Sequence, residues 1–164
     1  MHETLLIADS SPLIVLAKIG RLGLLPKLSA RIVVPMAVWR EVVMNKPASF
    51  DSRTLAEAPW LEVQSVTELE AGNLSINVDL GEAEAIALAS RFSDCVLLMD
   101  ERMGRREARR RGVRVLGTLG LLREAKRAGL IESLSNEIQT LLNVGHFLSP
   151  HLIEEVLHSV GENP

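Results

Sequence analysis

Short apolar runs of strand length alternate with helical patterns through most of this chain, and the alternation restricts the folds that it can adopt. The runs cover residues 5–8, 31–34, 61–66, 95–99 and 113–116. The first and the last two are continuously apolar, which is typical of parallel strands covered by helices on both faces. The pattern therefore predicts an α/β fold, a three-layer α/β/α sandwich around a central, mostly parallel sheet.

The chain length favours one domain. With 164 residues, the chain can bury one hydrophobic core but has little room for two. The alternation occupies residues 4–130, and two further amphipathic stretches follow within residues 131–161. We expect a single domain over residues 1–164, whose C-terminal helical extension either closes the core or forms a surface for a partner.

Composition excludes several classes of protein. No apolar run approaches the roughly 18 to 20 residues that a membrane-spanning helix needs. The first residues carry neither a basic segment nor a small-residue cleavage site, so we expect a cytoplasmic protein with no membrane partner. The single cysteine, Cys95, excludes an internal disulfide, and its apolar neighbours predict a buried strand residue rather than a metal ligand.

Two apolar runs end in aspartate, at Asp9 and Asp100. Ligands of open α/β sheets bind beyond the carboxyl ends of the strands, so both carboxylates are candidates for a functional site. Asp100 has a structural alternative, because it precedes a helical pattern and is placed to cap it. Asp9 is the stronger candidate, since Ser11 before Pro12 already serves as the predicted N-cap of the next helix.

Glu82 lies near the start of a predicted helix, in the sequence DLGEAEAIALA. Its structural explanation is a capping box, with Asp79 as N-cap and Glu82 as the third helical residue. Helical spacing also places Glu82 on the apolar face, whereas Glu84 belongs to another face. A carboxylate on an inward face is costly unless it is paired or binds a cation. Glu82 is therefore a candidate ligand, and Glu84 is a weaker rival.

Glu41 repeats this pattern in the apolar helix predicted over residues 36–44, where the alternative is that Arg40 and Glu41 mark its one exposed edge. Four carboxylates at one end of a sheet repel one another unless a divalent cation lies among them. Oxygen ligands favour Mg²⁺ or Mn²⁺ over zinc. The histidines all lie in the terminal segments, at His2, His146, His151 and His158.

The net charge of −3 argues against a nucleic-acid partner, but the charges are unevenly distributed. Ten of the eighteen Lys and Arg residues lie within residues 102–127. One interpretation is a solvated helix face with Glu101–Arg105 and Glu107–Arg111 pairs. The other is a basic patch for a nucleic-acid backbone, because such pairs leave most of the arginines uncompensated.

Motifs of several other chemistries are missing from the sequence. The chain contains no P-loop, no dinucleotide-binding glycine pattern, no serine-hydrolase elbow and no HExxH zinc motif. The GTLG stretch at residues 117–120 is weak evidence for a phosphate site, and Thr118 is predicted to be a helix N-cap.

Four segments together resemble a PIN domain: IADSSPLIVLAKIG, VVPMAVWREVV, DLGEAEAIALA and LLMDERMGRREARRRGVRVLGTLGLL. They are most similar to small prokaryotic PIN-like (DUF3368-type) proteins, the toxins of toxin–antitoxin pairs. The resemblance covers residues 4–130. No single segment carries it, but four in the right order are fairly specific.

The resemblance assigns roles to the carboxylates. It implies that Asp9, Glu82 and Asp100 are metal ligands, directly or through water. It implies that Glu41 positions a metal-bound water or a second ion, so that all four are catalytic residues.

Supporting residues and two departures follow from the same comparison. Ser11 matches the hydroxyl residue that supports the first aspartate, and Glu101 is placed to assist or simply to begin a helix. The third acidic position, usually aspartate, is Glu82 here. The residue before Asp100, usually polar, is Met99.

The resemblance also implies an activity. A PIN domain of this type would be an Mg²⁺- or Mn²⁺-dependent endoribonuclease that hydrolyses RNA phosphodiester bonds, the toxin of a type II toxin–antitoxin pair. Implied partners are the RNA substrate, a cognate antitoxin protein and a second copy in a homodimer. Aromatic residues are few, two Trp, three Phe and no Tyr, which argues against base stacking as the main means of recognition. The RNA backbone would be guided by basic residues after the fourth acidic position: Arg102, Arg105, Arg106 and Arg109.

Two alternatives come from other functional classes. A receiver-like signalling domain also gathers carboxylates and Mg²⁺ at strand ends, but it needs a lysine after the last strand, where this chain has Gly117 and Thr118. A PIN fold kept as a catalytically weak binding or regulatory module is favoured by the departures at Glu82 and Met99.

Overall fold

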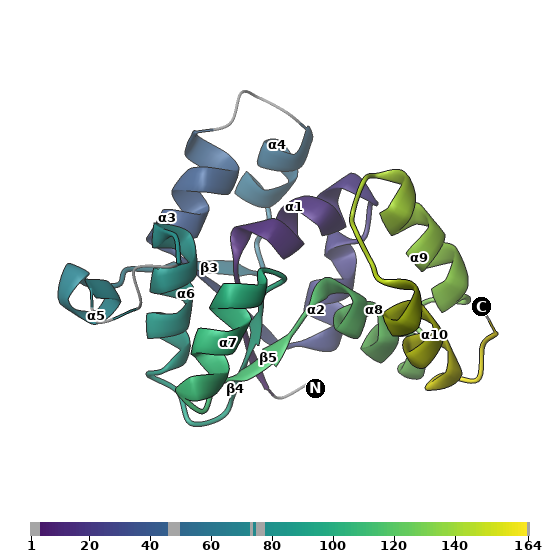
Figure 1. Cartoon of the computed structure of the whole chain (residues 1–164). Helices are drawn as coiled ribbons and strands as arrows, with labels where there is room; N and C mark the ends of the chain where they lie inside the picture. Colours follow the sequence, from purple (N-terminus) through teal and green to yellow (C-terminus); the bar gives the residue numbers. More distant parts are fainter. Residues whose placement is uncertain (1–3, 46–49, 73, 75–77, 164) are drawn as a thin grey trace.

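A five-stranded sheet forms the centre of the computed structural model (Figure 1). The structure describes residues 4–45, 50–72, 74 and 78–163, with residues 50–52 as backbone only. All neighbouring strands are parallel, in the order β3-β2-β1-β4-β5. The predicted α/β fold with helices on a parallel sheet is confirmed. The strands are β1 (Leu5–Ala8), β2 (Arg31–Pro35), β3 (Leu61–Gln64), β4 (Cys95–Leu98) and β5 (Arg114–Leu116).

Helices connect these strands and cover the sheet (Figure 1). Within the described part of the chain, none is long and apolar enough to cross a membrane. They are α1 (Ser10–Lys18), the 3-10 turn η1 (Leu22–Leu24), α2 (Leu25–Leu28), α3 (Met36–Trp39) with its π-helical continuation η2 (Arg40–Met44), α4 (Phe50–Ala56), α5 (Glu68–Gly72), α6 (Leu80–Ala89), α7 (Arg102–Arg110), α8 (Thr118–Arg127), α9 (Leu134–Asn143) and α10 (Pro150–His158).

Alternate strand side chains pack on opposite faces of the sheet. On one face, Leu6 and Val34 join a cluster with side chains of α1, α2 and α8. On the other face, Ile7 and Leu97 join a cluster with side chains of α6 and α7. Burial of both faces explains why β1 and β4 are continuously apolar. Cys95 is a free, buried thiol at the start of β4, as predicted.

The first helix begins two residues earlier than the sequence predicted. Ser11 is not its N-cap: α1 begins at Ser10, and Asp9 occupies the cap position without a side-chain cap bond. Pro12 is compatible with this start because the first four N–H groups of a helix lack intrahelical acceptors, and proline simply lacks one of them. The Asp9 N–H continues the β1–β4 pairing by donating to the carbonyl of Leu98, at 3.0 Å. Asp9 therefore connects β1 directly to α1, without a loop.

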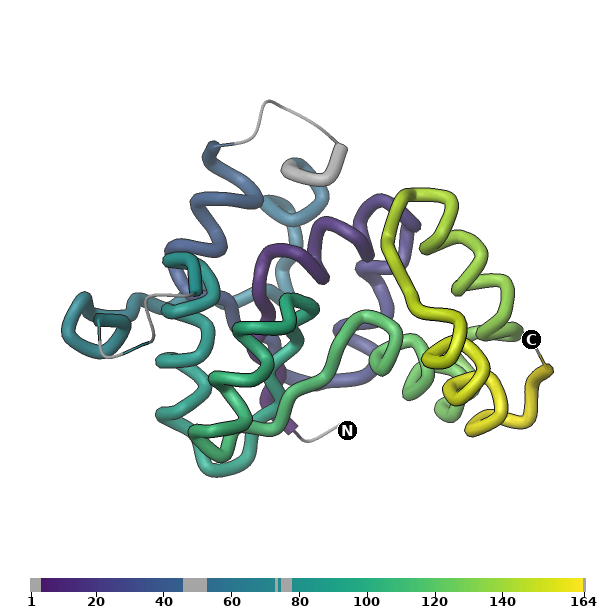
Figure 2. Tube along the Cα trace, in the orientation of Figure 1, coloured from purple at the N-terminus to yellow at the C-terminus, as the bar shows by residue number. Residues whose placement is uncertain are grey.

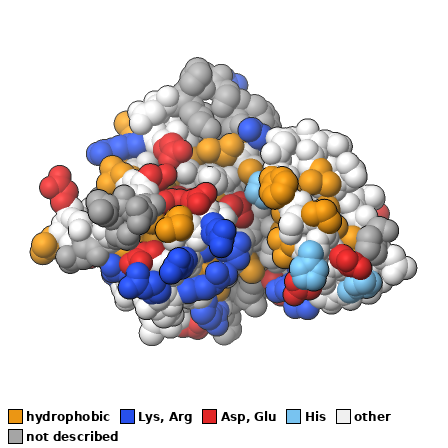
Figure 3. All heavy atoms as spheres, in the orientation of Figure 1, with side chains coloured by type: hydrophobic (Ala, Val, Ile, Leu, Met, Phe, Trp, Pro, Cys, Tyr) orange, Lys and Arg blue, Asp and Glu red, His pale blue; other side chains and the backbone are white. Residues whose placement is uncertain are grey.

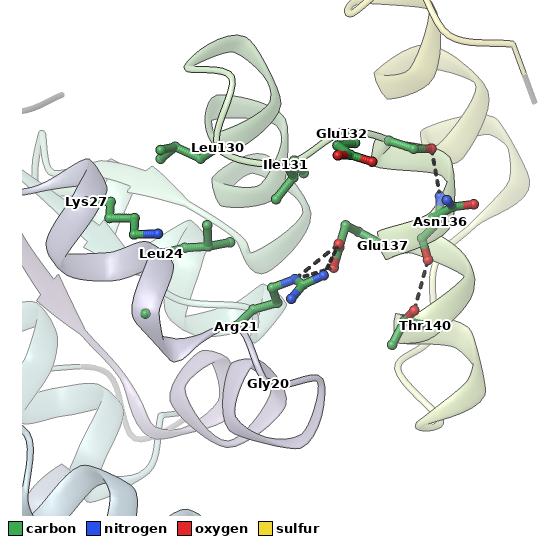
Figure 4. A pocket seen from close by; sticks show the side chains of 12 residues that line it. Gly20, Arg21, Leu24, Lys27, Leu130, Ile131, Glu132, Asn136, Glu137 and Thr140 are labelled. Carbon is green, nitrogen blue, oxygen red and sulfur yellow. Dashed lines mark hydrogen bonds and ion pairs between the residues drawn. The ribbon is translucent and has the colours of Figure 1, made fainter.

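The C-terminal helices close the core. Ile138 of α9 and Leu157 of α10 belong to the same cluster as Leu6 and Ala8 of β1. Arg21, after α1, donates to Glu137 of α9 at 2.7 Å across a pocket between these segments (Figure 4). The end of the chain lies beside α8 (Figure 2), where Glu162 pairs with Lys126 at 2.9 Å. Of the two predicted roles for this extension, core closure is observed.

Candidate functional site

Asp9 lies at the carboxyl end of β1 with only 2% of its surface exposed. Its Oδ1 is buried and has no hydrogen-bond partner among the described residues. Burial raises the pKa of Asp9 to about 7, although the Ser10 backbone lowers it. The negative charges of Glu82, Asp79 and Glu41 raise it further. A carboxylate in this position is unfavourable unless a proton or a cation neutralises it.

Glu82 combines the two roles that the sequence left open. Its backbone N–H donates to Asp79 Oδ1 at 2.8 Å, and its Oε2 accepts from the Asp79 N–H at 3.0 Å, which completes the predicted capping box. The side chain is also buried, with 6% of the residue exposed, and burial raises its pKa. Glu82 therefore caps α6 and, at the same time, places negative charge beside Asp9.

Glu41 and Glu84 lie in different surroundings. Glu41 is exposed on η2, and a Cβ added to Gly81 would lie 3.5 Å from Glu41 Oε2 and 3.4 Å from Asp79 Oδ1. Both carboxylates therefore lie close to the start of α6. Glu84 instead accepts from the Ala37 N–H of α3 at 2.9 Å. Glu84 holds α3 against α6, while Glu41 faces the acidic group.

Asp100 is fixed by Thr118 at the end of the neighbouring strand. Asp100 Oδ1 accepts from the Thr118 N–H at 2.7 Å, and Oδ2 accepts from Thr118 Oγ1 at 2.6 Å. The structural alternative for Asp100 is wrong, because Glu101 is the N-cap of α7 and accepts from Met103 N at 3.3 Å. Thr118 is not an N-cap either: Gly117 has that position, and Thr118 begins α8.

The acidic residues are not preassembled into a complete cage. In the described ranges, no group of three or more His, Cys, Asp or Glu side chains is arranged to hold a metal ion. Asp9, Glu82, Asp79 and Glu41 influence one another electrostatically, whereas Asp100 is held by Thr118. Ser11 is exposed in the first turn of α1.

Arginines of α7 lie beside these carboxylates. Asp and Glu side chains gather at the centre of the face in Figure 3, and Lys and Arg side chains cover α7 directly below them. The predicted Glu107–Arg111 pair is present at 3.1 Å. The predicted Glu101–Arg105 pair is not formed among the described residues, since Glu101 caps the helix. Three further arginines of this helix are exposed: Arg102, Arg106 and Arg109.

Arg105 differs from its neighbours. It is partly buried, and its Nε has no hydrogen-bond partner within the described residues. Burial lowers the pKa of Arg105, Arg109 lowers it further, and Asp100 raises it. A Cβ added to Gly117 would lie 3.2 Å from Arg105 Nη1 and 3.0 Å from Asp100 Oδ1. The guanidinium therefore lies close to the start of α8, next to Asp100.

Two residues of this site were assigned only helix-capping roles from sequence. Asp79 adds negative charge beside Asp9, and the capping-box spacing to Glu82 was the signal that both carboxylates share one helix end. Thr118 orients Asp100, and its place directly after β5, the neighbour of β4, was the corresponding signal.

The comparison with known families agrees with this geometry. A model of the PIN-domain family DUF3368 matches residues 5–162. The chain is a PIN domain. The match runs past residue 130, where the resemblance ended, and includes α9 and α10. PIN domains are generally nucleases and typically bind Mg²⁺. Among curated proteins, no significant match to the chain was found.

The donor set of this PIN domain fits a hard divalent cation. Asp9 Oδ1 is a buried carboxylate oxygen without a hydrogen-bond partner in the described part of the chain, and nearby negative charges are those of Glu82, Asp79 and Glu41. Mg²⁺ and Mn²⁺ prefer such oxygen ligands and retain several waters, so they do not require an all-protein cage. A cation at Asp9 would give its Oδ1 a partner and would reduce the repulsion between Asp9 and the neighbouring carboxylates.

Proposed function

We propose that this PIN domain is a metal-dependent endoribonuclease that hydrolyses RNA phosphodiester bonds with Mg²⁺ or Mn²⁺ as cofactor. The observation that carries the proposal is Asp9, a buried carboxylate with an unpartnered oxygen at the end of β1, surrounded by further carboxylates. Such a group is costly for folding and is retained where it has a chemical role.

The acidic residues have different roles in this proposal. Asp9, Glu82 and Asp100 would hold the cation, and Glu41, which is exposed, would orient the attacking water. When bound, the cation supplies an activated water and offsets the negative charge on the scissile phosphate and the leaving oxygen. Thr118 keeps Asp100 in one orientation through its hydroxyl and its N–H. No side chain is needed as a nucleophile.

The α7 arginines would reduce the repulsion between the carboxylates of this site and an RNA backbone. A group of carboxylates repels an RNA backbone, and cationic side chains next to it counter that repulsion. Arg102, Arg106 and Arg109 are exposed on the helix that begins directly after Asp100 and Glu101. We assign them to the phosphates that flank the cleavage point.

The biological setting is a separate part of the proposal. The resemblance to small prokaryotic PIN-like toxins supports a cytoplasmic toxin of a type II toxin–antitoxin pair, neutralised by a cognate antitoxin and able to form a homodimer. Growth arrest on expression, relieved by the protein encoded beside it, tests this setting. Unimpaired growth at high expression contradicts it.

The activity is tested by incubating the purified protein with a mixed pool of structured RNA in Mg²⁺, Mn²⁺ or EDTA. Asp9→Asn is compared with Asp94→Asn, which removes an equivalent charge from a side chain that is 74% exposed. We expect metal-dependent cleavage by wild type and Asp94→Asn, and a loss of at least about a hundredfold in Asp9→Asn. Equal cleavage by both variants contradicts the assignment of Asp9.

A catalytically weak binding or regulatory module is the second candidate. It is favoured by Glu82, one of whose two carboxylate oxygens, Oε2, is already engaged in the capping box with Asp79. The same assay separates the candidates. RNA binding without cleavage, unchanged in Asp9→Asn, supports the module.

A further inference from the structure

A second cavity adjoins the carboxylate site through Asp100. It has a volume of about 390 Å³ and lies between the start of α8 and the segment that leads into α10. One wall carries Asp100, Arg105 and Arg123, and the opposite wall carries His146 and Phe147. Residues far apart in the sequence thus form one hollow beside the proposed cleavage point.

The near wall of this cavity is cationic. Arg105 Nε is buried and lacks a partner among the described residues. Arg123 pairs with Glu124 at 3.0 Å, but Glu124 also pairs with Arg127 at 3.2 Å, so one carboxylate serves two guanidinium groups. The side chains of this wall thus carry two positive charges, on Arg105 and Arg123, against one negative charge on Asp100, and an anionic ligand would offset the excess.

The far wall is apolar and carries an aromatic ring. Phe147 is 87% exposed, although the chain has only three phenylalanines, and Leu152 of α10 is 39% exposed. Hydrophobic side chains gather over α9 and α10 on the face that also shows the acidic group (Figure 3). A ring in this position offers a flat surface to a planar ligand.

We infer that this cavity is a nucleotide subsite, in which Phe147 stacks on a base of the RNA and Arg105 binds an adjacent phosphate. The inference rests on the proposed function and adds the element that recognises a base. A purely apolar protein segment would offer no acceptor to the Arg105 guanidinium that lines the cavity, whereas a nucleotide offers a planar ring and an anion together. Few aromatics in the sequence argued against stacking as the main means of recognition, but one exposed ring beside Asp100 is enough to select a single position.

The test measures binding rather than cleavage. A fluorescein-labelled single-stranded RNA is titrated in EDTA with full-length Asp9→Asn protein, alone and combined with Phe147→Ala or Phe147→Trp. Leu69→Ala is the control, because Leu69 is 80% exposed on α5 and does not line the cavity. We expect Phe147→Ala to weaken binding about tenfold, Phe147→Trp to retain it, and Leu69→Ala to leave it unchanged.

An RNA of equal length with abasic positions separates stacking from phosphate binding. If Phe147 contacts a base, the tenfold effect of Phe147→Ala disappears on the abasic RNA, because no ring remains to stack. Equal affinities of Phe147→Ala and its parent for normal RNA overturn the inference, as does an undiminished effect on abasic RNA. A change in sedimentation without a change in RNA binding also overturns it and assigns the surface to a second copy.

These outcomes are independent of the cleavage assay. If the protein cleaves RNA but the Phe147→Ala variant binds RNA equally well, the proposed function stands and the subsite is refuted. If binding depends on Phe147 but the protein does not cleave RNA, the subsite stands and the nuclease assignment is refuted.

Discussion

Both carboxylate oxygens of Asp100 accept hydrogen bonds from Thr118, one from its N–H at 2.7 Å and one from its hydroxyl at 2.6 Å. Thr118 is fully buried, whereas Asp100 is partly exposed, so solvent reaches the carboxylate but not the residue that holds it. The contact joins the end of β4 to the start of α8 and gives Asp100 one orientation. A proposed ligand is thereby positioned by a residue that does not itself reach the substrate.

Thr118→Val should impair cleavage without unfolding the protein. Valine has nearly the same shape and keeps the N–H donor, but it lacks the hydroxyl that binds Asp100 Oδ2. We expect a loss of about 1–2 kcal/mol in stability and about a tenfold fall in kcat with little change in KM. Thermal unfolding and single-turnover cleavage measure the two effects. Thr118→Ser, which keeps the hydroxyl, should behave like wild type; equal defects in both variants would show that packing alone is responsible.

Asp9→Asn should stabilise the metal-free protein. The substitution removes a buried negative charge that lies beside Glu82, Asp79 and Glu41, and asparagine has nearly the same volume. In EDTA at neutral pH we expect a gain of about 1–2 kcal/mol in the free energy of unfolding.

The same variant tests metal binding by its response to Mg²⁺. Millimolar Mg²⁺ should raise the Tm of wild type, since it binds only the folded state, and leave the Tm of Asp9→Asn unchanged. Differential scanning fluorimetry with and without EDTA is the measurement. An identical Mg²⁺ response in the two proteins argues against a cation at Asp9.

The ion pair between Arg21 and Glu137 should contribute to stability mainly by neutralising Glu137. The Glu137 side chain is only 9% exposed, whereas that of Arg21 is 43% exposed. Arg21→Gln leaves a nearly buried carboxylate without a cationic partner and should cost about 2 kcal/mol, whereas Glu137→Gln should cost less. The double variant should recover part of the loss. Urea unfolding of all four proteins gives the coupling energy, and strict additivity would show that the pair contributes nothing.

Glu162 should make the attachment of the C-terminus dependent on pH. Burial raises the pKa of Glu162, but hydrogen bonds from Lys126 and from the N–H groups of Leu134 and Ser135 lower it more, to about 2. The value in the unfolded chain is near 4.5. Because the folded pKa is depressed, the stabilisation is complete above about pH 4.5 and is lost as the pH falls toward 2.

Glu162→Gln isolates this effect. At pH 7 we expect the variant to be about 1 kcal/mol less stable than wild type, a value reduced by the partial solvent exposure of the carboxylate. Thermal unfolding from pH 7 to pH 3 should show the difference narrowing below about pH 4.5. A difference that stays constant over this range contradicts the linkage.

Several features of the site were predictable from sequence because they depend on neighbours along the chain. The capping box of Asp79 and Glu82 is set by a three-residue spacing along the chain. Asp9 was identifiable because an apolar run ends there. The start of α1 was misplaced, since proline is tolerated at more than one position in a first turn.

Other features required the tertiary structure because their partners come from different elements. Glu84 and Ala37 of α3 are hydrogen-bonded although they lie 47 residues apart in the sequence, and Thr118 and Asp100 although they lie 18 residues apart. The role of Met99 belongs here too: a Cβ added to Gly104 would lie 2.5 Å from its sulfur, so Met99 fills the space where α7 packs closely on the sheet.

The sequence by itself determined the strands, the α/β class and the carboxylates at strand ends, because periodicity and chain direction are local properties. Only the tertiary structure decided which carboxylate remains without a partner, which is held by Thr118, and which faces α3. It also brought Phe147 beside Arg105 in one cavity. The burial of a side chain and its hydrogen-bond partners depend on residues that are distant in the sequence, so no local sequence pattern predicts them.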